Sequence, residues 1–208
     1  MRDTSPHAYH SRRGQLTMDT ARNFATLARH MTGDDGQALQ PCMANAPWSG
    51  PAVFGQRHVE ITATAALAQG STLMLEESAE EHAGTHNAGA ARPSNGRMGK
   101  VDGCRVDTCL PYANGGLWAM VDGALCLPEA WCGAAFAQTR RALGIPQERT
   151  CETNIALGLQ MVKRVKAQGG PVDRVACAAL YGRDGPFRAA LDTAGGLDAA
   201  QVPADTNV

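Results

Sequence analysis

Two short apolar runs in the sequence each lead into polar residues that are suited to a functional site. Ser71–Leu75 leads directly into Glu76 and Glu77, and Val175–Leu180 leads into Tyr181–Asp184. Runs of this length and composition are typical of buried strands. In open α/β sheets, the site lies at the carboxyl ends of such strands. The sequence therefore predicts a site where the ends of these two strands meet.

The residues around both runs resemble those of insertion-sequence transposases that have an RNase H-like DDE endonuclease domain. The resemblance covers roughly residues 35–208. Its motifs are PWSG at 47–50, EES at 76–78, GTHNAGAAR at 84–92, GKVDGCRV at 99–106, LPEAW at 127–131, LYGRD at 180–184 and QVPADT at 201–206. The first catalytic aspartate of the family stands at the place of Glu76, and the second stands at the place of Ala178.

This resemblance implies an ancestor that cut and joined DNA with divalent metal ions. Such enzymes hold two ions about 3.5–4 Å apart, and Mg²⁺ requires near-octahedral oxygen coordination at about 2.0–2.1 Å. Glu76 is one methylene longer than aspartate, and Ala178 supplies no oxygen. The soft sulfur of Cys177 does not replace a magnesium ligand. We therefore expect an inactive protein without a bound metal, and Mg²⁺ is the expected cofactor only of an active form.

The place of the third acidic residue of the family leads to a related expectation. In the family this residue lies beyond the strand that ends here near Val202, and the sequence stops at Val208. We therefore expect a degenerate, C-terminally truncated transposase. Two alternatives stay open. One is an active metal-dependent DNA nuclease in which Glu77 or Asp184 rebuilds the acidic site, and the other is a domesticated interaction or scaffold protein.

The charge of the chain is unevenly distributed although the net charge is only −1. Residues 138–188 contain nine Lys or Arg against four Asp or Glu. A basic stretch of this kind is suited to DNA phosphates, and it is equally typical of a solvated helix face. If it binds DNA, the binding should be weak and non-specific. The candidate DNA-binding residues are Lys163, Arg164, Lys166, Arg174 and Arg183.

The elements that position these residues follow from the spacing of apolar side chains. We expect a loose polar arm over 1–15, a helix over 17–31, a short helix over 39–44 with Pro41 in its interior, and a further helix from Ala52. After the strand at 71–75, a hairpin is expected from 99–110 and 117–127, with Asp102, Asp107 and Asp122 facing solvent. Helices over 133–143, 153–168 and 187–193 and a last strand over 199–202 complete the pattern.

This order predicts an α/β fold, an incomplete RNase H-like mixed sheet with flanking helices. The expected domains are a polar arm and helical segment at 1–60 and the incomplete RNase H-like domain at 61–208. The seven cysteines lack a CxxC pair, and we expect them to be buried and free of disulfides. Neither a secretory leader nor a long apolar run is present, so we expect a cytoplasmic protein that does not bind membranes. His82 and His86 are expected to lie in a polar loop.

Overall fold

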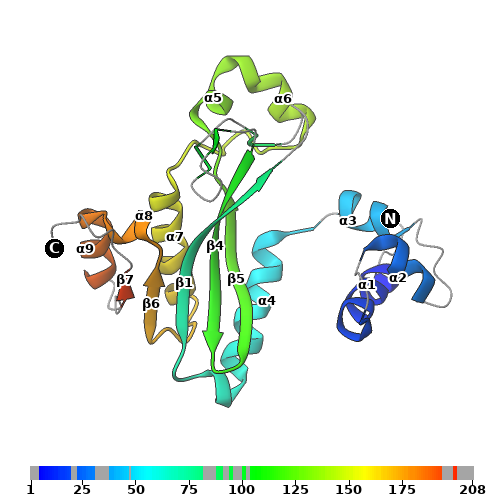
Figure 1. Ribbon diagram of the computed structural model, residues 1–208, viewed down its shortest axis with the longest axis horizontal. Coiled ribbons are helices and arrows are strands. Elements are labelled where there is room, and N and C mark those ends of the chain that lie inside the picture. The colour runs from blue at the N-terminus through cyan, green and yellow to red at the C-terminus, as the bar shows by residue number, and fades with distance from the viewer. Residues whose placement is uncertain are drawn as a thin grey trace. The chain divides into compact units, whose positions relative to one another are not determined.

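The computed structural model describes residues 5–19, 23–30, 38–46, 48–81, 88–90, 94–95, 100–101, 104–193 and 199–200. The chain divides into two compact units, Met1–Gly50 and Pro51–Val208 (Figure 1). The sequence predicts domains at 1–60 and 61–208. Helix α4 (Gly50–Ala63) packs on the sheet of the second unit through Ile61.

The first unit consists of three short helices around a small core. They are α1 (Ser5–Thr17), α2 (Phe24–His30) and α3 (Leu39–Asn45). Met18, Leu27 and Leu39 form the core. The α3 prediction is confirmed. Pro41 lies in the first turn of α3 rather than in its interior. In the first turn the missing N–H of proline costs little, because the backbone N–H groups there have no partner within the helix.

Two expectations for the first unit are wrong. Residues 5–15 are not a loose arm, since α1 begins at Ser5 and buries Ser11 and Gly14. One continuous helix over 17–31 is also wrong, because Asn23 starts a new helix. The Asn23 side chain accepts from the Thr26 amide at 3.0 Å, and the Thr26 hydroxyl accepts from the Asn23 amide at 3.2 Å. This reciprocal capping fixes the start of α2.

The second unit is built on a five-stranded mixed sheet. In spatial order its strands are β5 (Leu117–Leu125), β4 (Cys104–Asn114), β1 (Thr72–Glu81), β6 (Arg174–Cys177) and β7 (Ala199–Ala200). The first three are antiparallel, and β1, β6 and β7 are parallel. A separate pair, β2 (Ser94–Asn95) with β3 (Lys100–Val101), lies outside this sheet. The predicted hairpin and the RNase H-like fold are confirmed.

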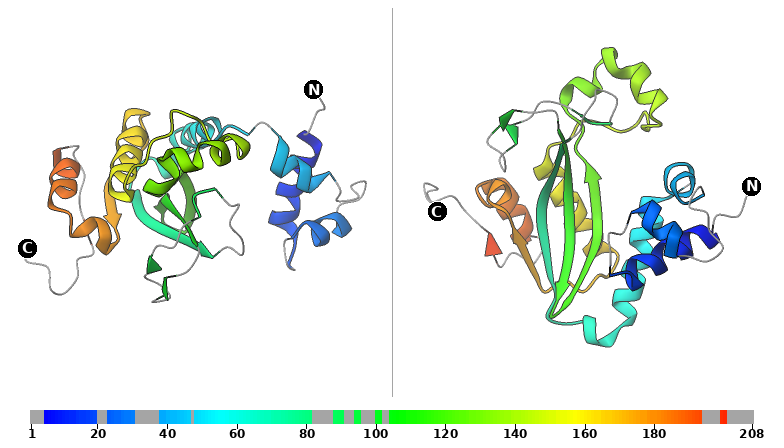
Figure 2. Two further views of the ribbon diagram at one scale, coloured as in Figure 1. Left: turned by 90° about the horizontal axis from the view of Figure 1, so that it is seen from above. Right: turned by 45° about the vertical axis from the view of Figure 1, so that its right-hand side comes forward.

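Helices cover one face of this sheet, which we call the inner face (Figures 1 and 2). They are α4, α7 (Asn154–Ala167) and α9 (Gly185–Thr193). Leu73 and Leu75 of β1 and Leu110 of β4 are buried there against Met161 and Val162 of α7. The opposite, outer face carries Trp118, which is 71% exposed. A 3₁₀ turn, Ala65–Leu67, connects α4 to the sheet.

The edge strand β5 contains an irregularity that changes which way its side chains point. The β4–β5 register shifts between Leu110 and Pro111, so Leu110 faces Asp122 whereas Pro111 faces Met120. Val121 is the additional residue, and its carbonyl oxygen lies 3.0 Å from His58 Nε2 of α4. Arg57 donates to the Met120 carbonyl at 3.4 Å. Helix α4 therefore binds the backbone of the edge strand where the bulge occurs.

A small helical lobe, residues 128–150, rises from the end of the sheet (Figure 1). It contains α5 (Glu129–Cys132), a 3₁₀ turn (Ala134–Phe136) and α6 (Ala137–Ala142). The expectation that all cysteines are free is wrong: Cys132 and Cys151 form a disulfide with Cα atoms 6.1 Å apart. The other five cysteines form no disulfide. Among the described helices, none is long and apolar enough to cross a membrane.

Candidate functional site

The sequence predicts that two strand ends meet beside Glu76, but the structure places the carboxyl end of β6 beside the middle of β1. β1 continues to Glu81 because it stays paired with β4 beyond Leu75. Pairing of these parallel strands ends with Leu75 opposite Cys177. The Ala178 amide then donates to the Leu75 carbonyl at 3.2 Å. Glu76 and Ala178 are the next residues on each chain, so the two positions stand side by side. The structure thus brings together the places of the first and second catalytic aspartates of the resembled family.

The strand before Ala178 is shorter than expected. β6 ends at Cys177, and the apolar residues after it form the helical turn α8 (Ala179–Gly182), for which Ala178 is the N-cap residue. Ala178 has an extended backbone and no side chain able to cap the turn. Burial raises the pKa of the neighbouring Cys177 thiol, and the charge of Glu76 raises it further. Cys177 therefore stays a neutral thiol, which is a poor metal ligand.

Glu76 and Glu77 point to opposite faces of the sheet, because side chains alternate along a strand. Glu76 pairs across the strands with Cys109 on the outer face and is exposed. Glu77 lies on the inner face, where its carboxylate accepts a hydrogen bond from the side-chain amide of Asn154, at the start of α7, at 2.7 Å. The two neighbouring carboxylates therefore do not converge on one ion.

Asp184, the other acid considered for a rebuilt site, has a structural role. Its side chain accepts a hydrogen bond from the Phe187 amide at 2.7 Å and thereby caps the start of α9. Throughout the described ranges, no group of three or more His, Cys, Asp or Glu side chains is arranged to hold a metal ion. His82 and His86 lie outside the described residues, and nothing tests the expectation for them.

A buried pair of hydroxyls lies behind Glu77, and sequence reasoning did not find it. Thr108 is the cross-strand neighbour of Glu77, and Tyr181 comes from α8; both are fully buried. Burial raises the pKa of the Tyr181 phenol, the charge of Glu77 raises it further, and the nearby Thr108 hydroxyl partly offsets both. Neither hydroxyl makes a hydrogen bond of acceptable geometry with the described residues. Tyr181 thus contributes packing, including a ring contact with Phe187 at 5.6 Å.

Replacing Tyr181 by Phe should raise the free energy of unfolding by about 1 kcal/mol, because it removes a buried hydroxyl without a partner. Tyr112→Phe is the matched control, since Tyr112 is buried in the same core but donates to the Leu67 carbonyl at 2.5 Å. That variant should lose about 1 kcal/mol. Urea unfolding of both variants measures the difference. A loss at Tyr181 equal to that at Tyr112 would show that the Tyr181 phenol has a partner.

The basic candidates do not gather around Glu76 and Ala178. Lys163 and Lys166 lie near the end of α7 away from Asn154, and nine residues of helix between Asn154 and Lys163 rise about 14 Å. Arg174 begins β6, opposite Thr72 at the start of β1. Only Arg183, which follows α8, belongs to the end of the sheet where Ala178 stands. Most of these charges are therefore at the opposite end of the strands.

Arg164 forms an ion pair with a buried acid. Its Nε donates to Asp122 Oδ2 at 2.7 Å, and the Asp122 side chain is 8% exposed. The expectation that Asp122 faces solvent is wrong, because the bulge in β5 turns it to the inner face. Asp107 is half-buried and pairs with Arg105 at 3.2 Å, which also differs from a fully solvated position. Asp102 lies outside the described residues.

Comparison with known proteins agrees with this geometry. A family model described as DDE superfamily endonuclease matches residues 3–208. No curated protein and no solved structure matches the chain. The match covers most of the first compact unit and all of the second, including Glu76 in β1 and Ala178 directly after β6. The chain therefore belongs to the DDE superfamily endonuclease family.

Proposed function

We propose that this chain is a transposase-derived member of its family that does not cleave DNA. The observation that carries the proposal is the alanine at position 178, directly beside Glu76 where the pairing of β1 with β6 ends. A two-metal site needs carboxylates that converge from neighbouring strands. Here the neighbouring strand supplies a methyl group, and the cross-strand partner of Glu76 is the thiol of Cys109.

The residues at this edge do not fit the Mg²⁺ ions that the family implies. Magnesium prefers oxygen ligands with near-ideal octahedral geometry. Glu76 is a single exposed carboxylate next to soft or apolar groups, Glu77 is turned to the opposite face, and Asp184 caps α9. No catalytic step through a metal is therefore assigned to these residues.

DNA association is the remaining activity that we propose, through charge rather than base recognition. Lys163, Arg174 and Arg183 are exposed, and positive charges attract phosphates at long range. Arg164 already neutralises the buried Asp122 and adds less to such a field. Because the basic residues are spread over both ends of the strands, we expect contacts with the backbone of any duplex rather than with one sequence.

A plasmid-nicking assay tests the proposed lack of cleavage. With Mg²⁺ or Mn²⁺, the native chain should leave supercoiled plasmid intact. Ala178→Asp alone should also be inactive, because repairing one member of a catalytic unit recovers almost nothing while another stays defective. Ala178→Asp combined with Glu76→Asp tests whether both positions suffice.

One result would overturn the proposal in favour of a rebuilt acidic site. It is cleavage by the native chain that depends on added metal and disappears in Glu76→Ala or Glu77→Ala. Glu80→Ala serves as the control for general effects of removing a carboxylate from β1, because Glu80 pairs with Arg105 at 2.7 Å on the outer face. Cleavage that survives all three substitutions would indicate a contaminating nuclease and would leave the proposal standing.

A further inference from the structure

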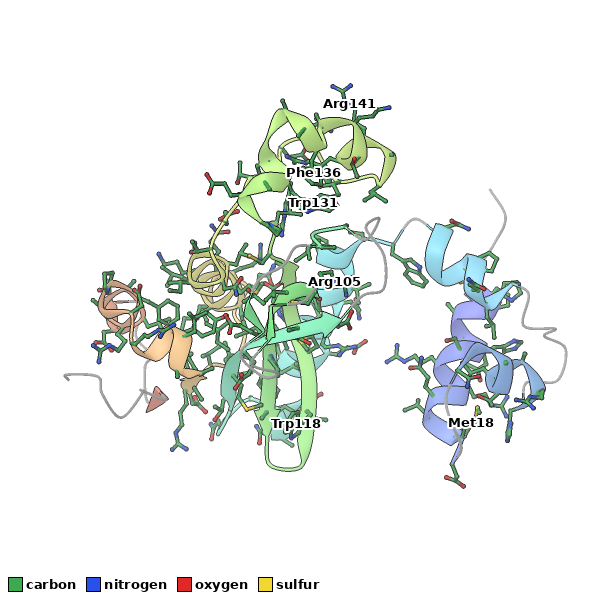
Figure 3. All side chains as sticks on the ribbon, turned by 45° about the horizontal axis from the view of Figure 1, so that its top comes forward. Met18, Arg105, Trp118, Trp131, Phe136 and Arg141 are labelled. Atoms are coloured by element: carbon green, nitrogen blue, oxygen red, sulfur yellow. A yellow bond between two sulfur atoms is a disulfide. The ribbon has the colours of Figure 1, made fainter. Side chains whose placement is uncertain are left out.

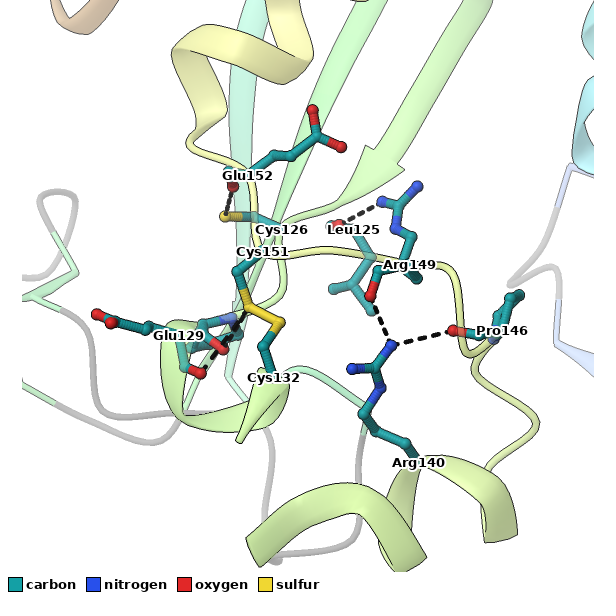
Figure 4. Close-up of a disulfide and its surroundings, with 10 residues drawn as sticks. Leu125, Cys126, Glu129, Cys132, Arg140, Pro146, Arg149, Cys151 and Glu152 are labelled. Atoms are coloured by element: carbon teal, nitrogen blue, oxygen red, sulfur yellow. Dashed lines mark hydrogen bonds between the residues drawn. A yellow bond between two sulfur atoms is a disulfide. The ribbon is translucent and has the colours of Figure 1, made fainter. Parts of the chain in front are cut away.

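The disulfide between Cys132 and Cys151 closes the neck of the helical lobe (Figure 4). The chain leaves the sheet after Leu125 and comes back to this point at Cys151, just before α7; the two segments form the neck. At this neck, Arg149 donates to the Leu125 carbonyl at 2.7 Å, and the Cys126 thiol donates to the Glu152 carbonyl at 3.5 Å. The disulfide is the covalent member of this set, and it joins residues separated by 19 positions.

Little else holds the lobe together. Trp131 and Phe136 stack with ring centroids 4.8 Å apart, as Figure 3 shows, and Trp131 donates to the Ala90 carbonyl at 2.9 Å. The buried Arg140 donates to the carbonyls of Pro146 at 3.0 Å and Arg149 at 2.6 Å. Most other side chains of the lobe are exposed. A loop with so small a core depends on closure of its neck.

The surroundings of the two sulfur atoms are compatible with both the disulfide and the two thiols that reduction would produce. Cys132 is exposed, so a reagent in solution can reach the bond. Cys151 Sγ lies 3.3 Å from the Pro128 carbonyl oxygen, so the thiol formed by reduction has a hydrogen-bond acceptor waiting. Cys126 is nearby, but burial raises the pKa of its thiol and the charge of Glu77 raises it further. Since only thiolates attack disulfides, Cys126 competes poorly for exchange.

We propose that Cys132 and Cys151 form a redox-controlled clasp that locks the lobe onto the start of α7. A small-molecule or protein dithiol reduces the bond: its two sulfurs join to each other, two electrons pass to the Cys132–Cys151 bond, and its two protons end on the new thiols. Oxidation reverses the step by passing both electrons to a disulfide reagent. Three residues after Cys151, the Asn154 side chain donates to Glu77, so the clasp lies next to the segment that contacts β1.

Limited trypsin digestion of the full chain tests the clasp. Arg140 is buried and Arg149 is held at the neck, whereas Arg141 is exposed on α6, where Figure 3 shows it pointing outward. Reduction with dithiothreitol should speed cleavage at these three arginines about tenfold, because the open lobe is populated more often. In the oxidised chain, the two fragments from such a cut should stay joined on a non-reducing gel.

Variants separate the clasp from a general effect of reductant. The double variant Cys132→Ser with Cys151→Ser should be cut at the fast rate with and without dithiothreitol. Cys109→Ser, which removes a half-buried free thiol from β4, should behave like the native chain. Counting thiols in denaturant should give five before reduction and seven after it. Seven thiols after exposure to a disulfide oxidant, or equal cleavage rates in the two redox states, would overturn the proposal.

Discussion

Raising the salt concentration from about 50 to about 200 mM should lower the affinity of this chain for duplex DNA about 100-fold. The estimate follows from release of counterions when about four phosphates are neutralised, with a slope of roughly 0.9 per phosphate on logarithmic axes. Lys163, Lys166, Arg174 and Arg183 are the candidate residues for these contacts. Arg164 forms an ion pair with Asp122. Fluorescence anisotropy of a labelled duplex measures the dependence.

Substitutions that each remove one positive charge show which basic residues contact DNA phosphates. Lys163→Gln and Arg183→Gln should each reduce the salt slope by about 0.9 if the residue contacts a phosphate. Arg164→Gln is the matched control on α7: it should change the DNA slope less and lower the free energy of unfolding, since it leaves the buried Asp122 carboxylate unpaired. An affinity that does not respond to salt, or a strong preference for one short duplex, would contradict electrostatic binding.

Replacing Gly158 by Leu should destabilise the second unit by about 2–3 kcal/mol. Gly158 lies in α7 directly over β1, and a Cβ atom there would stand 2.5 Å from Leu75 Cδ2 and 3.0 Å from Leu75 Cδ1. Leu75 is fully buried in the core between α7 and the sheet. The substitution therefore pushes α7 away from the strand that carries Glu76 and Glu77.

Gly55→Leu is the matched control, because Gly55 is also inside a helix, α4, but a Cβ atom there has no neighbour within 4 Å. That variant should gain up to about 0.8 kcal/mol from helix propensity. For a chain of this length, a difference of about 3 kcal/mol corresponds to roughly 6–12 °C between the two melting temperatures. Equal melting temperatures would mean that the contact between α7 and β1 is not tight.

The sheet and the place of the site could be predicted because they depend on local pattern. The apolar runs before Glu76 and Tyr181 and the turn at Gly115 each favour one local structure, and the resemblance supplies their order. Gly115 has φ of +55°, a value that glycine adopts easily. The adjacency of Glu76 and Ala178 then follows from parallel pairing of β1 with β6.

The features that were not predicted depend on contacts between distant residues. Asp122 was assigned to solvent by strict alternation, but one additional residue in β5 turns every later side chain to the other face. The disulfide forms because the fold of the lobe brings Cys151 back beside Cys132. The spacing of the cysteines in the sequence does not indicate this proximity. Residues 5–17 lack an apolar stripe, and their helix is stabilised by packing against Leu27 rather than by their own pattern.

Binding of α4 to β5 has a consequence for the behaviour of the protein at high concentration. An edge strand with free amides and carbonyls is a template on which a strand of another molecule can add. Here Arg57 and His58 occupy the carbonyls of Met120 and Val121, and the bulge interrupts the regular spacing that an added strand would need. Helix α4 and the bulge at Val121 together protect the edge strand β5 against the addition of strands from other molecules.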